Sequence, residues 1–314
     1  MLEILFWLVL IVITFILGTR VFLQGQDLSV FDRSIDSSMR SGDPSEQHHQ
    51  SVDAIAGMFG TGEESKDRKA QLSESRKAMN ESGDTADMTG VRLQEVVADG
   101  VPAEWVFVEG ADPQKRLLYI HGGGFMMGSP RSHRVITTTL SRITNASVLA
   151  IDYRLTPENK RVACIEDCQA AYKWILDNGP DGQAGAPSSF FIAGDSAGGN
   201  LTLMSIAWAR DMGLPAVNAA VALSPLTDST FSSPSMRSNI ETDHMLGPSL
   251  APMTKMPQML RAWIGLIMNR VKPNDPRVSP IFGDLSDLPP TLVQASEAEV
   301  LLDDSRRWVN KAQD

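Results

Sequence analysis

The sequence predicts an α/β fold, in which a mostly parallel, doubly wound sheet is flanked by helices. Three observations predict it: short apolar runs of β-prone residues, helical stretches that alternate with these runs, and glycine-rich turns directly after two of them. Short runs without polar alternation are typical of strands buried on both faces. Strands that alternate with helices form parallel sheets covered by helices.

The elements of this fold are expected within residues 88–314. The first two strands are expected to form a hairpin around the turn Ala98-Asp99-Gly100. Strands are expected at 91–97, 104–108, 116–120, 147–153, 190–193, 219–223 and 291–295. Helices are expected between the later strands at 135–144, 164–178 and 198–211.

The composition is that of a globular protein with a sizeable core. The chain has 314 residues and a formal net charge of −10, and 42% of its residues are hydrophobic against 21% charged. These proportions exclude a wholly disordered chain. The acidic balance argues against nucleic acid as a partner, because phosphate binding needs clustered Lys and Arg. Cys164 and Cys168 lie four residues apart in a predicted helix, so we expect them to pack as small apolar side chains without a disulfide.

Residues 1–23 are expected to form a membrane anchor. The apolar run at 4–17, extended by further apolar residues up to Leu23, approaches the length of about 20 residues that a span requires. No Lys or Arg precedes the run and no small-residue cleavage motif follows it, which favours an uncleaved single-pass anchor. The alternative is cleavage as a signal segment, which would yield a secreted or periplasmic protein. Arg20, Arg33 and Arg40 follow the run and weakly favour a cytoplasmic body.

Residues 24–87 are expected to be a polar linker with cap-like helices. The segment is rich in Ser, Asp, Arg and Gln, which is typical of loosely packed chain, and helices are expected at 53–58 and 65–79. His48 and His49 have no further ligand residues at metal-binding spacing, so we interpret them as solvated side chains. The sequence therefore predicts no metal site.

A candidate nucleophile lies between a predicted strand and a predicted helix. Gly194-Asp195-Ser196-Ala197-Gly198 matches the pattern G-x-S-x-G, which holds a serine hydroxyl exposed on a sharp strand-to-helix turn. The helix that follows offers N–H groups and a favourable dipole to developing negative charge. Ser196 is the predicted nucleophile, and Asp195 supports the motif.

A second glycine motif follows the strand at 116–120. His121-Gly122-Gly123-Gly124 offers backbone N–H groups with no side chains in the way, as stabilisation of an oxyanion requires. We assign the oxyanion hole to the N–H groups of Gly123, Gly124 and Ala197, with Gly122 as an adjacent turn residue. His121 is interpreted as a residue that braces the loop by a hydrogen bond, in preference to a general base.

Together these motifs resemble the hormone-sensitive-lipase-like family of α/β-hydrolases. The resemblance rests on segments 100–105, 121–125 (HGGGF), 152–155, 194–200 (GDSAGGN), 224–225 and 288–305. It implies a serine carboxylesterase that hydrolyses small-molecule acyl esters with short to medium chains through an acyl-enzyme intermediate. It implies no metal or organic cofactor, and a helical cap built partly from the N-terminal region.

The resemblance also places the acid of a catalytic triad at Glu299, which would orient an imidazole base. Asp303 and Asp304 are the rival positions, and otherwise are expected to be a helix N-cap pair.

The sequence departs from the family pattern at the base. In the family, a histidine follows the acid beyond one further strand, whereas here no histidine follows His244. We therefore expect the last strand and helix to be missing and the sequence to be a fragment with impaired catalysis. His244 and His133 are interpreted as structural or surface residues. The alternative function is a non-catalytic ligand-binding protein that has lost its base.

Overall fold

The computed structural model describes residues 2–35, 43–60 and 67–314. The chain divides into two compact units. The sheet unit contains Glu63–Leu226 and Asp284–Ala295, and the helical unit contains Met1–Gly62, Thr227–Gly283 and Ser296–Asp314. The predicted segment 88–314 therefore contributes to both units. Parts of the predicted linker, at 36–42 and 61–66, lie outside the described residues.

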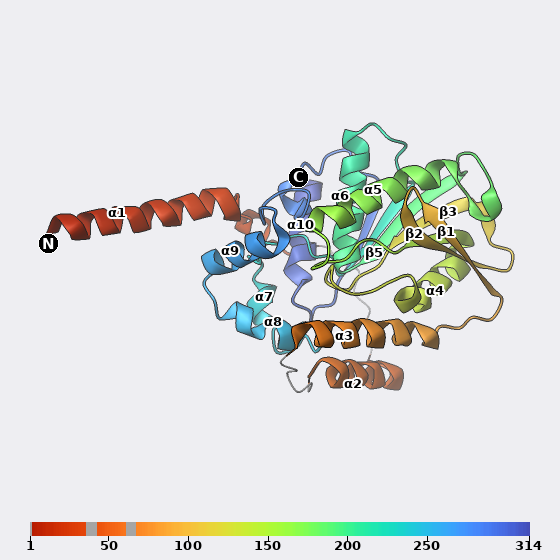
Figure 1. Ribbon diagram of the computed structural model, residues 1–314, viewed down its shortest axis with the longest axis horizontal. Coiled ribbons are helices and arrows are strands. Elements are labelled where there is room, and N and C mark those ends of the chain that lie inside the picture. The colour runs from red at the N-terminus through yellow and green to blue at the C-terminus, as the bar shows by residue number, and fades with distance from the viewer. Residues whose placement is uncertain (1, 36–42, 61–66) are drawn as a thin grey trace. The chain divides into compact units, whose positions relative to one another are not determined.

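In the described residues, seven strands form one sheet, in the order β1-β2-β4-β3-β5-β6-β7. Figure 1 labels four of them, β1, β2, β3 and β5. They are β1 (Val91–Ala98), β2 (Val101–Val108), β3 (Asp112–Ile120), β4 (Ala146–Ile151), β5 (Ser189–Asp195), β6 (Ala219–Leu223) and β7 (Thr291–Gln294). β2 pairs antiparallel with β1 and β4, and all other neighbours pair in parallel. The predicted mostly parallel sheet is confirmed.

Along the chain, the helices of the sheet unit either precede β1 or lie between the strands. They are α3 (Arg68–Ser82), α4 (Arg134–Thr144), α5 (Arg161–Asp177) and α6 (Ala197–Asp211), with the short turns η3 (Gly83–Thr85), η4 (Arg131–His133) and η5 (Pro180–Gly182). The three helices α4, α5 and α6 pack against the strands. Cys164 and Cys168 are buried and unbonded to each other in α5, as predicted, because a thiol behaves as a small apolar group.

The hairpin and the central strand show why the sequence pattern located the sheet. Asp99 and Gly100 have φ of 49° and 88°, the positive values that a two-residue hairpin turn requires and that Asp and Gly tolerate. All six residues of β4 are buried, and apart from Ser147 they are apolar, so the apolar run in the sequence located this strand. β3, by contrast, begins four residues before the predicted start. Its first residues are polar and partly exposed, so they lack the apolar pattern of a buried strand.

The helical unit contains the first helix and most of the chain after residue 226. Its elements are α1 (Leu2–Thr19), η1 (Arg20–Gln24), η2 (Ser29–Phe31), α2 (Glu46–Gly60), α7 (Ser235–Ser238), α8 (Gly247–Thr254), α9 (Gln258–Asn269), η6 (Pro280–Phe282) and α10 (Leu302–Gln313). The helix expected at 53–58 lies within the longer α2, and the one expected at 65–79 corresponds to α3 in the sheet unit.

The chain after α1 is bonded to α10 at the point where a linker is predicted. Leu23 and Leu28 are buried. Arg307 of α10 forms a two-pronged ion pair with Asp32, at 2.6 and 2.9 Å. The amide of Asn310 donates to the backbone oxygens of Phe31 and Arg33. This part of the predicted linker is thus ordered, because its backbone and one carboxylate find specific partners on α10.

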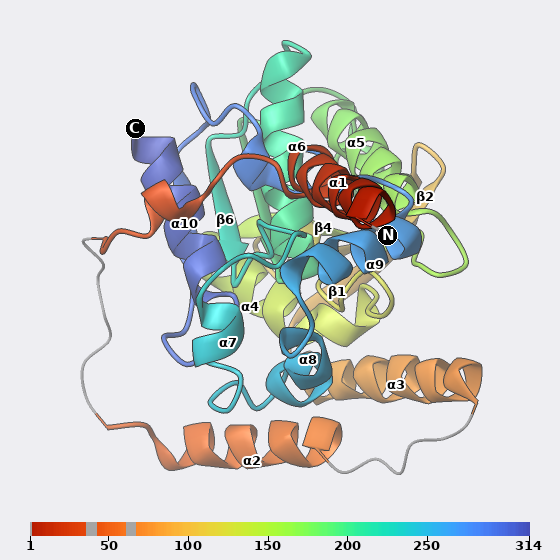
Figure 2. The ribbon, with the colours of Figure 1, turned by 90° about the vertical axis from the view of Figure 1, so that its left-hand side faces the viewer.

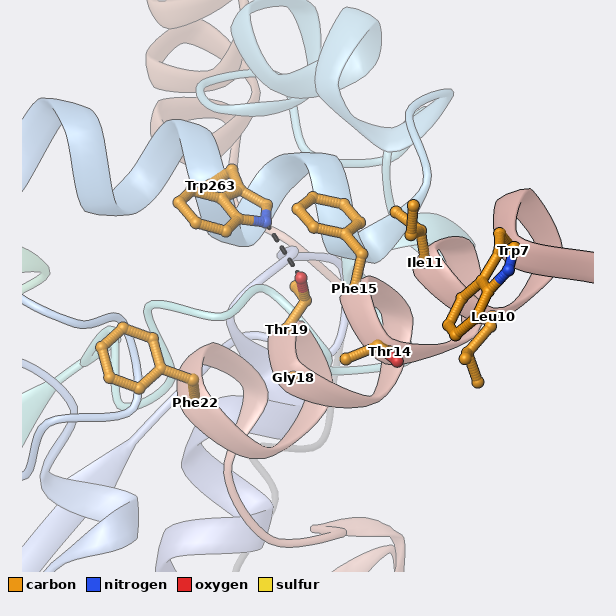
Figure 3. Close-up of a pocket in the computed structure, with 9 residues that line it drawn as sticks. All are labelled: Trp7, Leu10, Ile11, Thr14, Phe15, Gly18, Thr19, Phe22 and Trp263. Carbon is orange, nitrogen blue, oxygen red and sulfur yellow. Dashed lines mark hydrogen bonds between the residues drawn. The ribbon is translucent and has the colours of Figure 1, made fainter. Parts of the chain in front are cut away.

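α1 projects from the helical unit in Figure 1 and is seen end-on in Figure 2. Most of its described apolar side chains are exposed. Its C-terminal part contacts α9, where the Phe15 and Trp263 rings stack at 5.9 Å and the indole of Trp263 donates to the Thr19 hydroxyl at 3.1 Å (Figure 3). Between the two helices lies an open groove of about 620 Å³. The residues lining this α1–α9 groove are Trp7, Leu10, Ile11, Thr14, Phe15, Gly18, Thr19, Phe22 and Trp263.

Candidate active site

Ser196 sits at the junction of β5 and α6, where it adopts a strained backbone conformation. Its φ is 52° and its ψ is −114°, a region that non-glycine residues rarely occupy and that is typical of functional turns. The Ser196 N–H donates to the Leu223 oxygen at 2.7 Å, which holds the turn against β6. A Cβ on Gly198 would overlap the Ile120 oxygen. The glycine at this position is therefore required by close packing of the turn against β3.

The glycine loop lies directly after β3, the strand beside β5 in the sheet. A Cβ on Gly122 would overlap the Asp195 carboxylate, and one on Gly123 would overlap the Met127 oxygen. Gly123 and Gly124 have φ of 113° and 61°, which favour glycine. Side chains are thus excluded by space at Gly122 and Gly123, and disfavoured by backbone conformation at Gly123 and Gly124.

The three predicted oxyanion-hole donors belong to the sheet unit. In the described part of the chain, the N–H groups of Gly123 and Gly124 donate to no acceptor. Ala197 is the first residue of α6, so its N–H has no acceptor within the helix. These N–H groups are available to bind an anionic or carbonyl oxygen.

Asp195 connects the glycine loop to the serine turn. Its Oδ1 accepts hydrogen bonds from the Tyr119 hydroxyl at 2.6 Å and from the Gly122 N–H at 2.9 Å, and its Oδ2 lies 3.4 Å from Nε2 of His133. Burial opposes ionisation of Asp195, but the contacts with His133 and Tyr119 outweigh it and lower the pKa of the carboxyl. Asp195 is therefore a carboxylate that fixes the two motifs relative to each other.

His121 and His133 brace the same loop. The His121 Nδ1 lies 2.7 Å from the Gly122 oxygen, and its ring stacks on Tyr153 at 4.2 Å. Burial lowers the pKa of His121 to about 3, so the ring is neutral near pH 7. His133 is also buried, and its Nδ1 bonds the Ser132 hydroxyl at 2.8 Å. In the described residues, no hydrogen bond joins either ring to Ser196.

Sequence reasoning missed a contact between α3 and this site. Arg76 donates from Nε to the Met126 oxygen at 2.7 Å and from Nη2 to the Thr156 oxygen at 3.0 Å. The same guanidinium pairs with Glu158 at 2.8 and 2.9 Å, and that hydrogen bonding lowers the pKa of Glu158 to about 2. We call this set the Arg76 clamp. No local sequence pattern predicts these contacts of Arg76, because a helix face rich in charged residues normally faces solvent.

The candidate acids belong to the helical unit. Glu299 is partly buried five residues after β7, and its backbone oxygen accepts from the Asn239 amide at 2.9 Å. The Asp303 carboxylate accepts from the Ser235 N–H at 2.8 Å. Both residues are thus close in sequence to the end of a sheet strand, and each is held by the turn that includes α7.

Asp304 is fully buried, and its carboxylate accepts from the N–H groups of Thr227 and Asp228 at 2.7 and 2.9 Å. Burial, and then the charge of Asp228, raise the pKa of Asp304 to about 7. The expectation that Asp303 and Asp304 cap their own helix is wrong. Leu301 is the N-cap residue of α10, and both carboxylates bind N–H groups of the chain at 227–235 instead. His244 is exposed in the turn between α7 and α8.

Comparison with known proteins identifies the family. A family model described as the alpha/beta hydrolase fold matches residues 117–314. An acetyl-hydrolase of Streptomyces hygroscopicus is 35% identical over 76% of this chain and 75% of its own length. The crystal structure of an esterase from the bacterial hormone-sensitive lipase family is 30% identical, with a TM-score of 0.69 over 88% of this chain and 85% of that one. The chain belongs to the hormone-sensitive-lipase-like family of α/β-hydrolases.

Other members of this family are similarly close. An esterase of Acinetobacter venetianus is 34% identical over 72% of this chain and 67% of its own length. The crystal structure of an esterase/lipase from an uncultured bacterium is 33% identical, with a TM-score of 0.72 over 86% of this chain and 85% of that one. The family and fold that the two glycine motifs predict are thus confirmed.

Proposed function

We propose that the protein is a carboxylic ester hydrolase of the serine type, with Ser196 as nucleophile and short- to medium-chain acyl esters as substrates. Ester hydrolysis is the activity that its family relatives share by name. The observation that carries the serine assignment is the strained turn at Ser196, tied through Asp195 to a glycine loop with unused N–H groups. No metal or organic cofactor enters the proposed reaction.

In the proposed reaction, the Ser196 hydroxyl oxygen bonds to the acyl carbon while its proton passes to a general base. The resulting oxyanion is bound by the N–H groups of Gly123, Gly124 and Ala197. Its collapse breaks the ester bond, and the alcohol leaves with a proton. Water then hydrolyses the acyl-enzyme and restores the serine.

The acid and the base are proposed separately from the nucleophile. We assign Glu299 to orient the imidazole base, since it follows β7 closely and β7 lies beside β6 in the sheet. His121 and His133 are bound within the loop and are not assigned as the base. His244 is exposed and is the first histidine to test.

Covalent labelling tests the nucleophile independently of turnover. A fluorophosphonate should add to Ser196, as peptide mass spectrometry would show, and Ser196→Ala should abolish both labelling and hydrolysis of p-nitrophenyl butyrate. The matched control is Ser188→Ala, since Ser188 is exposed before β5. Labelling that persists in Ser196→Ala would refute the assignment. Ligand binding without any labelling or turnover would instead favour the non-catalytic alternative.

Variants of the acid candidates separate Glu299 from Asp303. In a protein that carries the imidazole base, Glu299→Gln should lower kcat by about 10²–10⁴-fold, as loss of a triad acid does. In a chain without that base, the same change should leave the residual hydrolysis unaltered. Asp303→Asn should lower stability, because it weakens the bond from the Ser235 N–H, with kcat largely kept. A large loss of kcat in Asp303→Asn, with kcat kept in Glu299→Gln, would assign the triad acid to Asp303. His244→Ala should leave kcat unchanged.

We also propose that residues 1–23 anchor the protein in a membrane and that 24–87 provide a linker and cap-like helices. One helix in the described residues, Leu5–Gln24, is long and apolar enough to cross a bilayer, and almost none of it is buried. The rival is a cleaved signal segment. N-terminal sequencing and alkaline extraction of the expressed protein distinguish them, since an anchor keeps residue 1 and stays with the membrane.

A further inference from the structure

We propose that α9 is an interfacial helix whose exposed apolar face lies in the lipid bilayer beside α1. The inference rests on the membrane anchor proposed above and adds a second contact with the membrane. The occupant is the lipid bilayer, because α9 contacts the anchor helix near the point where that helix would leave the membrane.

The exposed face of α9 is apolar, unlike the solvent-facing side of a helix in a soluble protein. Its outward residues include Leu260, Ile267 and Met268, whose exposed fractions are 47%, 71% and 67%. The one charged residue of α9 in the sequence is Arg261, and this residue is buried. A helix on the surface of a soluble protein normally presents polar side chains outward. Contiguous exposed apolar surface of this kind marks an interaction site.

The contacts with α1 fix the depth of α9. Phe15 stacks on Trp263 of α9, and Thr19 accepts the hydrogen bond from the same indole. Arg20 is the first charged residue after the apolar run, and Thr19 and Leu23 are buried in the helical unit. The part of the Leu5–Gln24 helix in the hydrocarbon core would therefore end near Thr19. Phe15 precedes Thr19 by four residues, or about 6 Å along the helix. Interfacial helices insert to about 5–10 Å, so a helix that touches both residues lies at interfacial depth.

The residues around these contacts suit a membrane boundary. Trp263 has an apolar stacking partner and a bonded N–H, the two-sided character that concentrates Trp at bilayer interfaces. Lys272, just after α9, places its ammonium 3.7 Å from the centre of the Phe22 ring. With Arg20 and Arg270 it provides cations that suit anionic headgroups. The α1–α9 groove is open and apolar, and lipid acyl chains would fill it.

Labelled cysteines in the full chain test this contact. The native cysteines are buried, so an environment-sensitive dye can be attached at Ile267→Cys in α9. Val12→Cys, in the middle of α1, reports on the anchor, and Glu241→Cys is the exposed control in the turn after α7. The protein is reconstituted into phosphatidylcholine vesicles that contain phosphatidylglycerol as the minor lipid. Quenching is measured with lipids that carry a nitroxide near the headgroup end of the acyl chain, and with aqueous iodide.

We expect the emission of the dye at position 267 to shift to the blue, to be quenched by the lipid nitroxide and to be protected from iodide. At position 241 we expect no blue shift, quenching by iodide and no quenching by the lipid nitroxide. Quenching by lipid nitroxide at 12 but not at 267 would overturn the interfacial helix and leave the anchor standing. No lipid quenching at either position would overturn both. Protection at 267 from iodide without lipid quenching, together with disulfide cross-linking between unlabelled copies of the Ile267→Cys protein, would assign the face to a second copy of the chain.

Discussion

Replacement of Asp195 tests whether the two glycine motifs work as one site. Asp195→Ala removes the acceptor for the Tyr119 hydroxyl and the Gly122 N–H, at 2.6 and 2.9 Å. Hydrogen bonds to a charged group contribute about 1.5–3 kcal/mol each. The Asp195 side chain is 22% exposed, so water can replace part of this loss, and we expect a fall of about 2–4 kcal/mol in the free energy of unfolding.

The same change should also lower kcat, because Gly122 is adjacent to the proposed donors. Loss of one oxyanion-hole donor costs about 10²–10³-fold in kcat. A displaced loop should cost less than an absent donor, so we expect about a 10- to 100-fold loss. The measurements are p-nitrophenyl butyrate turnover and urea unfolding followed by circular dichroism.

Two matched variants show whether the loss of kcat in Asp195→Ala comes from the displaced glycine loop or from the lost negative charge. Asp195→Asn keeps an oxygen where Oδ1 accepts both bonds, so it should retain most of kcat. Tyr119→Phe removes one bond without touching the glycine loop, so it should lower stability more than kcat. An Asp195→Ala protein that is destabilised but turns over normally would refute the reasoning. An Asn variant as inactive as the Ala variant would show that the charge, and not the loop geometry, is what matters.

Four further outcomes are expected. Gly122→Ala should destabilise the fold and abolish turnover, because its Cβ would overlap Asp195. Gly124→Ala meets open space at a φ of 61°, so urea unfolding should show a loss of only about 1 kcal/mol. Arg76→Lys should lower kcat with little change in KM, because a lysine cannot reproduce the forked donor set, while circular dichroism stays unchanged. The raised pKa of Asp304, about 7, means that the folded state binds a proton more tightly than the unfolded state. Stability should therefore fall as pH rises from about 4 to about 7. Asp304→Asn should flatten this dependence in melting scans.

The predicted parts of the fold are those with a local signature. β4 is buried along its whole length, so its apolar run identified it, and the Asp99-Gly100 turn located the hairpin. The polar start of β3 carried no such pattern. These residues join the sheet through backbone pairing with β4 and β5. Their polar, partly exposed side chains do not reveal that pairing.

The candidate site divides in the same way. Ser196 and the glycines follow from motifs whose residue types the backbone requires. The bonds of Asp195 and the Arg76 clamp join segments about 50 to 80 residues apart. Such pairings depend on tertiary structure, and a single sequence shows only an acidic residue and a charged helix. The N-cap expectation for Asp304 failed for this reason, since its partners are backbone N–H groups at 227 and 228.

The attachment of residues 31–33 to α10 limits how far α10 can lie from the C-terminal end of the helix that begins at α1. Seven chain steps separate Gln24, where the helical chain after α1 ends, from Phe31, whose oxygen is held by Asn310. Fully extended, these steps cover about 25 Å. If α1 is embedded in a bilayer, α10 cannot rise farther than this from the end of the helix. The helical unit then lies close to the lipid surface, which favours substrates that are concentrated at that surface.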